Sequence, residues 1–151
     1  MKDLNTPTST ISERTILAAI IDGHAPDILS SEITEDWFFD SMNKSAFIAA
    51  KRLFDTSSDL TEITIATELN VEQSKIAFTD QSDSDMFISS LPYGNVEQWR
   101  PAFDVCRTKA FQRDMIHCTR DLLESLQQPQ TYLQGVSDAM EEPFAKLMNF
   151  S

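Results

Sequence analysis

Apolar residues recur at spacings of three and four along most of the chain, a pattern typical of amphipathic helices. The first repeat covers residues 16–21, between a candidate capping box at Thr10 and Glu13 and Gly23, a residue favoured just after a helix. Pro26 suits the first turn of a short second helix. The pattern therefore predicts a helical N-terminal region.

The next helices are predicted from their capping residues. Asp40 or Ser41 can cap a third helix, and Thr61 can cap a fourth that ends near Leu69. Another short helix is predicted over residues 71–78. The polar stretch TDQSDSD is predicted to be a surface loop.

The C-terminal third predicts two longer helices. Pro101 is tolerated only in a first turn, so a long helix is expected from about residue 98 to 126. Thr131 is a candidate cap for the last helix, in which Pro143 should cause a kink. No segment alternates like a strand, so we expect an all-α fold: a flexible arm at 1–9, a globular bundle of short helices at 10–91 and a protruding two-helix hairpin at 98–148.

Composition narrows the class of protein. Apolar residues make up 41% of the chain, enough for a core, and there are only three glycines. No apolar run approaches the roughly 18 residues of a membrane span, and the N-terminus lacks an apolar signal core. A cytoplasmic protein with no membrane partner is the expectation.

The formal charge of −12 is unevenly distributed. Residues 1–99 hold 6 basic and 17 acidic side chains, a net charge of −11, whereas residues 100–151 hold 6 and 7, a net charge of −1. An acidic surface repels phosphate, so direct nucleic-acid binding is disfavoured. A basic or mixed-charge protein partner fits better.

Residues that carry chemistry do not form a recognisable site. There is no GxxxxGK[ST] phosphate loop, so ATP hydrolysis is not expected. His117 and Cys118 are adjacent and would point about 100° apart on a helix, which excludes a nucleophile–base pair within it. The two histidines and two cysteines lack zinc-site spacing. The chain is therefore expected to be neither an enzyme by itself nor a carrier of a cofactor or metal.

Two features of the C-terminal helices have both a structural and a functional interpretation. Basic residues either pair locally or form a docking edge for an acidic partner, and they include Arg107, Lys109, Arg113 and Arg120. Some of the apolar side chains must form the core of the hairpin, by packing on Val136, Met140 and Phe144. A two-helix hairpin has too little surface to bury them all, so the excess predicts a dimer or partner interface. The candidates are Phe111, Met115, Cys118, Leu122, Val136 and Met140.

Four segments carry a family resemblance in their order and separation: SERTILAAII, EDWFFDSMNKSAFIAAKRLF, LTEITIATELN and DVCRTKAFQRDMI. Together with residues 136–147, they resemble the N-terminal domain of the DnaB-type replicative DNA helicases. The resemblance covers about residues 9–148. The ATP-hydrolysing domain of that family has no counterpart here.

The resemblance implies a structural core and a role. The core residues it implies are Ile16, Leu17, Trp37, Phe38, Phe39, Phe47, Ile63 and Leu69. The implied role is that of an assembly and protein-interaction domain in DNA replication, which forms dimers or, in a parent helicase, a hexameric ring and docks a primase or helicase loader. The alternative is a stand-alone regulator, loader or inhibitor that mimics this domain and binds a host helicase or primase. A reading frame that continues past Ser151 into a phosphate-loop domain would favour the first.

The absence of a phosphate loop and the net charge of −12 lead to a prediction. At physiological salt the chain should bind neither ATP nor single-stranded DNA, because its surface repels phosphate. Fluorescence anisotropy with labelled oligonucleotide and nucleotide tests this. Micromolar binding of either probe would contradict it.

Overall fold

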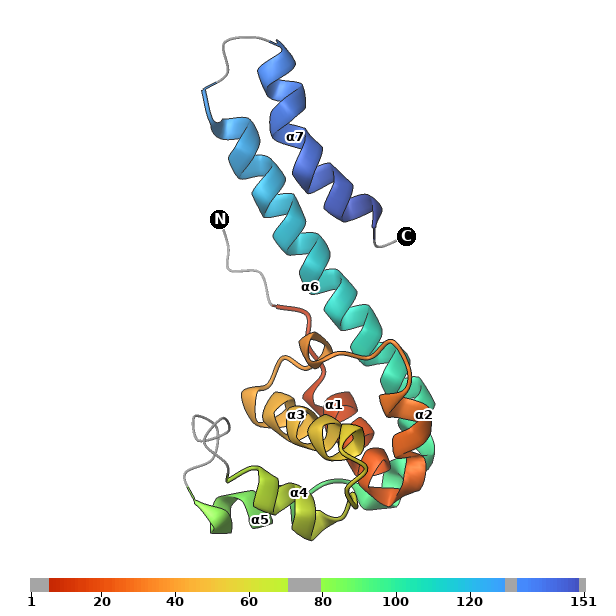
Figure 1. Ribbon diagram of the computed structural model, residues 1–151. Helices are drawn as coiled ribbons and strands as arrows, with labels where there is room; N and C mark the ends of the chain where they lie inside the picture. Colours follow the sequence, from red (N-terminus) through yellow and green to blue (C-terminus); the bar gives the residue numbers. More distant parts are fainter. Residues whose placement is uncertain (1–5, 71–79, 130–132, 150–151) are drawn as a thin grey trace. The chain divides into compact units, whose positions relative to one another are not determined.

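The computed structural model describes residues 6–70, 80–129 and 133–149, and the regular structure in these ranges is entirely helical (Figure 1). The predicted all-α class is therefore confirmed. The chain divides into two compact units, Thr8–Ala110 and a second made of Met1–Pro7 with Phe111–Ser151. The boundary lies inside the long helix that the sequence assigned wholly to the hairpin.

The N-terminal region contains α1 (Thr10–Ala19), the π-helical turn η1 (Ile20–His24) and α2 (Ala25–Leu29). The side chain of Ser9 caps α1 by accepting from the backbone N–H of Ser12, so the predicted cap at Thr10 was wrong by one residue. Gly23 has φ +103°, and a Cβ built on it would meet nothing within 4 Å. Backbone conformation, not space, requires glycine here.

The middle region contains the 3-10 turn η2 (Glu35–Trp37), α3 (Ser41–Asp55) and α4 (Glu62–Glu68). The N-terminal caps of α3 and α4 are residues that the sequence predicted as caps. Asp40 accepts from the N–H of Asn43, and Thr61 forms a reciprocal capping box with Thr64. The helix predicted over residues 71–78 lies outside the described residues.

Helix α5 (Gln81–Ser89) begins inside the stretch predicted to be a loop. The carboxylate of Asp80 accepts from the N–H of Asp83, so an acidic residue that was assigned to a loop instead caps a helix. The 3-10 turn η4 (Tyr93–Gln98) then leads into α6 (Trp99–Gln127), and α7 (Leu133–Met148) follows. The predicted start of α6 is confirmed, whereas Thr131 lies outside the described residues.

A buried carboxylate connects α1 to the start of α3. Glu13 is fully buried. Its carboxylate accepts hydrogen bonds from the backbone N–H groups of Phe39 and Asp40 and from Nδ2 of Asn43, at 3.1, 3.3 and 3.1 Å. These three bonds bridge 26 to 30 residues of sequence and hold the entry to α3 against α1.

The core of the Thr8–Ala110 unit gathers around α1 and α3. Five of the eight residues expected in it are buried: Ile16, Leu17, Phe38, Phe47 and Leu69. Phe38 stacks on Phe47, with 4.7 Å between ring centroids. Trp37 is half-buried and meets the ring of Phe103 edge-on at 4.8 Å. The aromatic run is therefore mainly structural.

Two expected core residues are exposed. Phe39 follows Phe38 in extended backbone, where successive side chains point to opposite sides, so burial of Phe38 turns Phe39 outward. Ile63 is 79% exposed because the buried side of α4 carries Ile65 and Ala66. Ile63 lies two residues before Ile65, about 200° around the helix.

The bonds to Glu13 lead to a stability prediction. Glu13→Ala leaves three donors without their acceptor in a buried place and should lower the free energy of unfolding by about 3 kcal/mol or more. Urea denaturation followed by circular dichroism measures the change. The matched control is Glu35→Ala, at an exposed position, which should alter stability by less than about 0.5 kcal/mol. Equal effects of the two substitutions would contradict the role given to Glu13.

Candidate interaction surface

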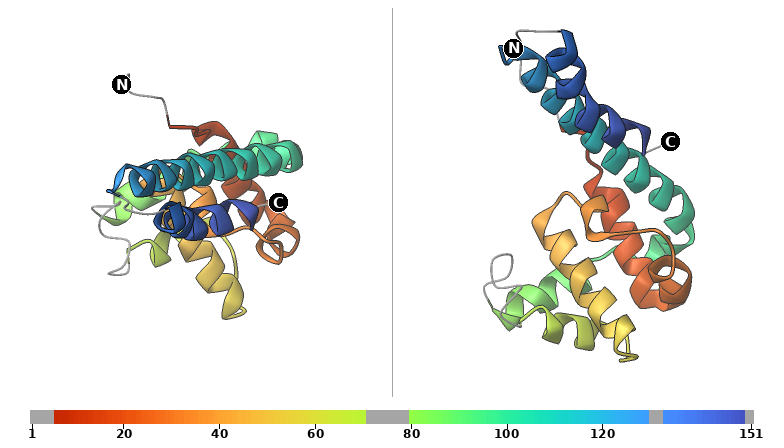
Figure 2. Two further views of the ribbon diagram at one scale, coloured as in Figure 1. Left: turned by 90° about the horizontal axis from the view of Figure 1, so that it is seen from above. Right: turned by 45° about the horizontal axis from the view of Figure 1, so that its top comes forward.

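The candidate surface lies on the helical hairpin of the second unit. The C-terminal half of α6, from Phe111, and helix α7 run antiparallel and side by side (Figures 1 and 2). Cys118 of α6 and Pro143 of α7 are buried there. Helix α7 continues on both sides of Pro143, the residue at which the sequence predicted a kink.

The structure divides the predicted interface residues into three groups. Phe111 is exposed. The half-buried residues are Met115, Leu122, Val136 and Met140. Cys118 is only 4% exposed because its own chain already covers the thiol, so it belongs to the core of the hairpin.

Several apolar side chains that were not among the predicted interface residues are exposed on the same hairpin. They are Leu123, Leu126, Leu133, Phe144 and Met148, of which Leu133 is 85% exposed. Leu133 and Phe144 belong to the apolar repeat that predicted α7, but a repeat alone does not say which of its members face solvent. Met140 and Phe144 also line a shallow pocket of about 470 Å³ on α7.

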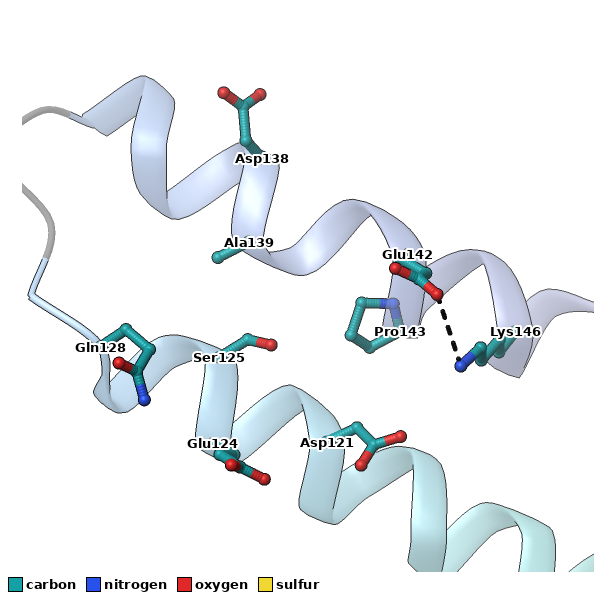
Figure 3. Close-up of a pocket in the computed structure, with 9 residues that line it drawn as sticks. All are labelled: Asp121, Glu124, Ser125, Gln128, Asp138, Ala139, Glu142, Pro143 and Lys146. Atoms are coloured by element: carbon teal, nitrogen blue, oxygen red, sulfur yellow. Dashed lines mark ion pairs between the residues drawn. The ribbon is translucent and has the colours of Figure 1, made fainter.

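A second cleft lies between α6 and α7 and is polar (Figure 3). Asp121 and Glu124 contribute carboxylates from α6, and Glu142 contributes one from α7, where it pairs with Lys146 at 3.6 Å. Pro143 points from α7 toward α6, while Asp138 points away (Figure 3). The cleft, of about 530 Å³, is too acidic to attract a phosphate group.

The predicted docking charges belong to both units. Arg107 pairs with Glu32 at 3.4 Å in the Thr8–Ala110 unit, where Lys109 is half-buried. In the other unit, Nη1 of Arg113 donates to the carbonyl of Pro7 at 2.9 Å, and Arg120 is exposed. The contacts of Arg107 and Arg113 favour the structural interpretation of these two residues, and Arg120 stays a candidate docking charge.

The two units also differ in net charge. Thr8–Ala110 holds 8 basic and 17 acidic residues, a net charge of −9, whereas Phe111–Ser151 holds 3 and 6, a net charge of −3. Self-association therefore meets less electrostatic repulsion through the hairpin than through the larger unit.

Within residues 6–70, 80–129 and 133–149, no three His, Cys, Asp or Glu side chains gather as a metal site would require. In the same ranges no helix is long and apolar enough to cross a membrane. The exposed apolar side chains of the hairpin are thus the main candidate feature of this unit.

Comparison with solved structures identifies the fold. The chain superposes on the crystal structure of the N-terminal domain of DnaB helicase from Mycobacterium tuberculosis with a TM-score of 0.76 and 14% sequence identity, covering 93% of this chain and 99% of that one. The fold is that of a DnaB N-terminal domain. No family model and no curated protein sequence matches the chain. At this identity the likeness shows the fold alone, and it agrees with the resemblance in the sequence.

The burial of Cys118 and Cys106 leads to a prediction about thiol reactivity. Both thiols should react slowly with a small disulfide reagent in the native protein, because neither is accessible to solvent. The reaction is followed by the absorbance of the thiolate that the reagent releases, and urea-unfolded protein gives the value for complete reaction. Rapid reaction of either thiol in dilute native protein would contradict its burial within one chain.

Proposed function

We propose that this chain is a non-enzymatic assembly and protein-interaction domain that acts with a replicative DNA helicase. The observation that carries the proposal is the DnaB N-terminal fold over 93% of the chain. The chain itself unwinds nothing, and any ATP-dependent activity belongs to a helicase of which it is a part or with which it associates.

The hairpin surface supports a symmetric dimer. Leu133 and Phe144 of α7 and Leu123 of α6 expose apolar side chains on one small unit. Burying such side chains stabilises a complex by roughly 25 cal/mol per Å² of apolar area removed from water. In a two-fold interface the same patch serves both chains, so each exposed residue contributes twice.

The contacts of this dimer are proposed to include Phe111, Met115, Leu122, Val136 and Met140, joined by Leu133 and Phe144. Four of the first five are half-buried, and Phe111 is exposed. In a parent helicase such dimers would build a ring of six subunits. A primase or a helicase loader is the proposed external partner, in keeping with a surface whose charge disfavours nucleic acid.

Oligomeric state tests the proposal. Wild-type protein should be a dimer at high micromolar concentration, and Phe144→Glu should be a folded monomer, because two like charges would be buried across the two-fold axis. Light scattering gives the mass, and circular dichroism verifies the helical content.

The matched control is Ile11→Glu, which places a charge at an exposed apolar position of α1 in the other unit. It should leave the dimer intact. A wild-type chain that remains monomeric at high micromolar concentration would contradict self-assembly and favour the stand-alone regulator, whose hairpin binds a foreign partner.

A further inference from the structure

A groove lies between α4 and α5, in the Thr8–Ala110 unit. The two helices pack side by side (Figure 1). The groove has a volume of about 370 Å³ and is lined by Glu62, Ile63, Ala66, Thr67, Gln81, Asp85, Ile88 and Ser89. Ala66 and Ile88 form the buried floor beneath the groove, and Ile63, 79% exposed, supplies most of its accessible apolar surface.

Side-chain hydrogen bonds fix one rim of this groove. Nδ2 of Asn70 donates to Oε1 of Gln81 at 2.5 Å, and Nε2 of Gln81 donates to Oδ1 of Asp85 at 2.8 Å. The chain of amides holds the Asp85 carboxylate in place. A partner would therefore meet a charge that is already positioned, at a smaller entropic cost than a mobile side chain would impose.

A second carboxylate, that of Glu62, lines the groove from α4. Burial, with Glu62 nearby, raises the pKa of Tyr93, whose hydroxyl donates to the carbonyl of Ile88 at 2.6 Å. The phenol thus stays protonated and keeps its bond to the end of α5. This bond helps to keep the floor residue Ile88 in position.

The sequence in and around α4 and α5 is strongly acidic. Residues 53–70 and 80–99 contain no lysine or arginine and eight carboxylates: Asp55, Asp59, Glu62, Glu68, Asp80, Asp83, Asp85 and Glu97. Two of these carboxylates pair with basic side chains, Glu68 with Arg52 at 2.6 Å and Asp55 with Lys51 at 3.3 Å. The field around the groove therefore attracts cations and repels phosphate.

An apolar floor with an acidic rim matches one kind of partner. We propose that the α4–α5 groove docks a basic amphipathic helix of another protein, with one large apolar side chain placed against Ile63 and lysines or arginines facing Glu62 and Asp85. A groove between two helices suits a third helix laid along it, and no strand edge is present in the described ranges for an extended peptide to join. This site does not depend on the proposed hairpin dimer, since all its residues lie in the other unit.

A labelled peptide tests the docking site on the full chain. The probe is a fluorescein-labelled helical peptide of about 15–20 residues made of Leu, Ala, Lys and Arg, with leucines on one face. Anisotropy should show saturable binding that weakens severalfold between low and high salt, as expected for attraction between charges. The same peptide with glutamate in place of each basic residue should not bind.

Two pairs of matched variants distinguish the groove from a general attraction to an acidic protein. Ile63→Ser should raise the Kd about tenfold, as expected for the loss of one buried apolar side chain. Ile11→Ser should not change it, although Ile11 is equally exposed at 80%. The double variant Glu62→Gln with Asp85→Asn should weaken binding and its salt dependence more than Asp27→Asn with Glu35→Gln, which removes the same charge elsewhere in the unit.

Backbone amide chemical shifts locate the bound peptide independently. Shifts concentrated at Ala66, Thr67, Gln81 and Asp85 support the proposal. Equal effects of the serine variants, shifts spread over the acidic surface, or no shifts at α4 and α5 with millimolar peptide would each overturn it. None of these outcomes bears on the mass of the wild-type protein, so the docking site and the hairpin dimer fail or succeed separately.

Discussion

The arrangement of α1 and α3 in the larger unit depends on the hydrogen bonds that the carboxylate of Glu13 accepts. A buried charge is unfavourable unless its oxygens accept hydrogen bonds, and here three donors from the entry to α3 supply them. Because two of those donors are backbone N–H groups of Phe39 and Asp40, the bonds fix the extended backbone before α3. That conformation sends the ring of Phe38 inward, where it stacks on Phe47, and sends Phe39 outward.

The parts of the fold that depend on neighbouring residues could be predicted from the sequence. Helical periodicity, the caps at Asp40 and Thr61, and the helix start beside Pro101 all follow from contacts within one or two turns. The spacing of Thr10 and Glu13 predicted a local capping box. The carboxylate of Glu13 instead bonds to residues that lie 26 to 30 positions away. A sequence pattern does not contain that separation.

The candidate surface shows the same limit. Periodicity places Ile63, Leu133 and Phe144 on helices, yet whether each faces the core or solvent depends on which helix packs against which side. For Ile63, the burial of Ile65 and Ala66 decides the matter. Cys118 shows the other outcome: it belongs to the same apolar stripe as Phe111 and Met115, yet its own chain covers the thiol. The exposure of individual apolar side chains was thus the feature that the sequence predicted least well, and it is the feature on which the proposed interaction surfaces rest.

Gly23 carries a consequence that concerns handedness. Its φ of +103° lies where L-residues are strained, while the space around it is open. L-Alanine there would cost of order 1 kcal/mol through the backbone alone. D-Alanine, the mirror-image residue, prefers positive φ and would avoid this backbone strain. It would also restrict the unfolded chain, so a synthetic protein with one D-residue in this turn should be more stable than the natural one.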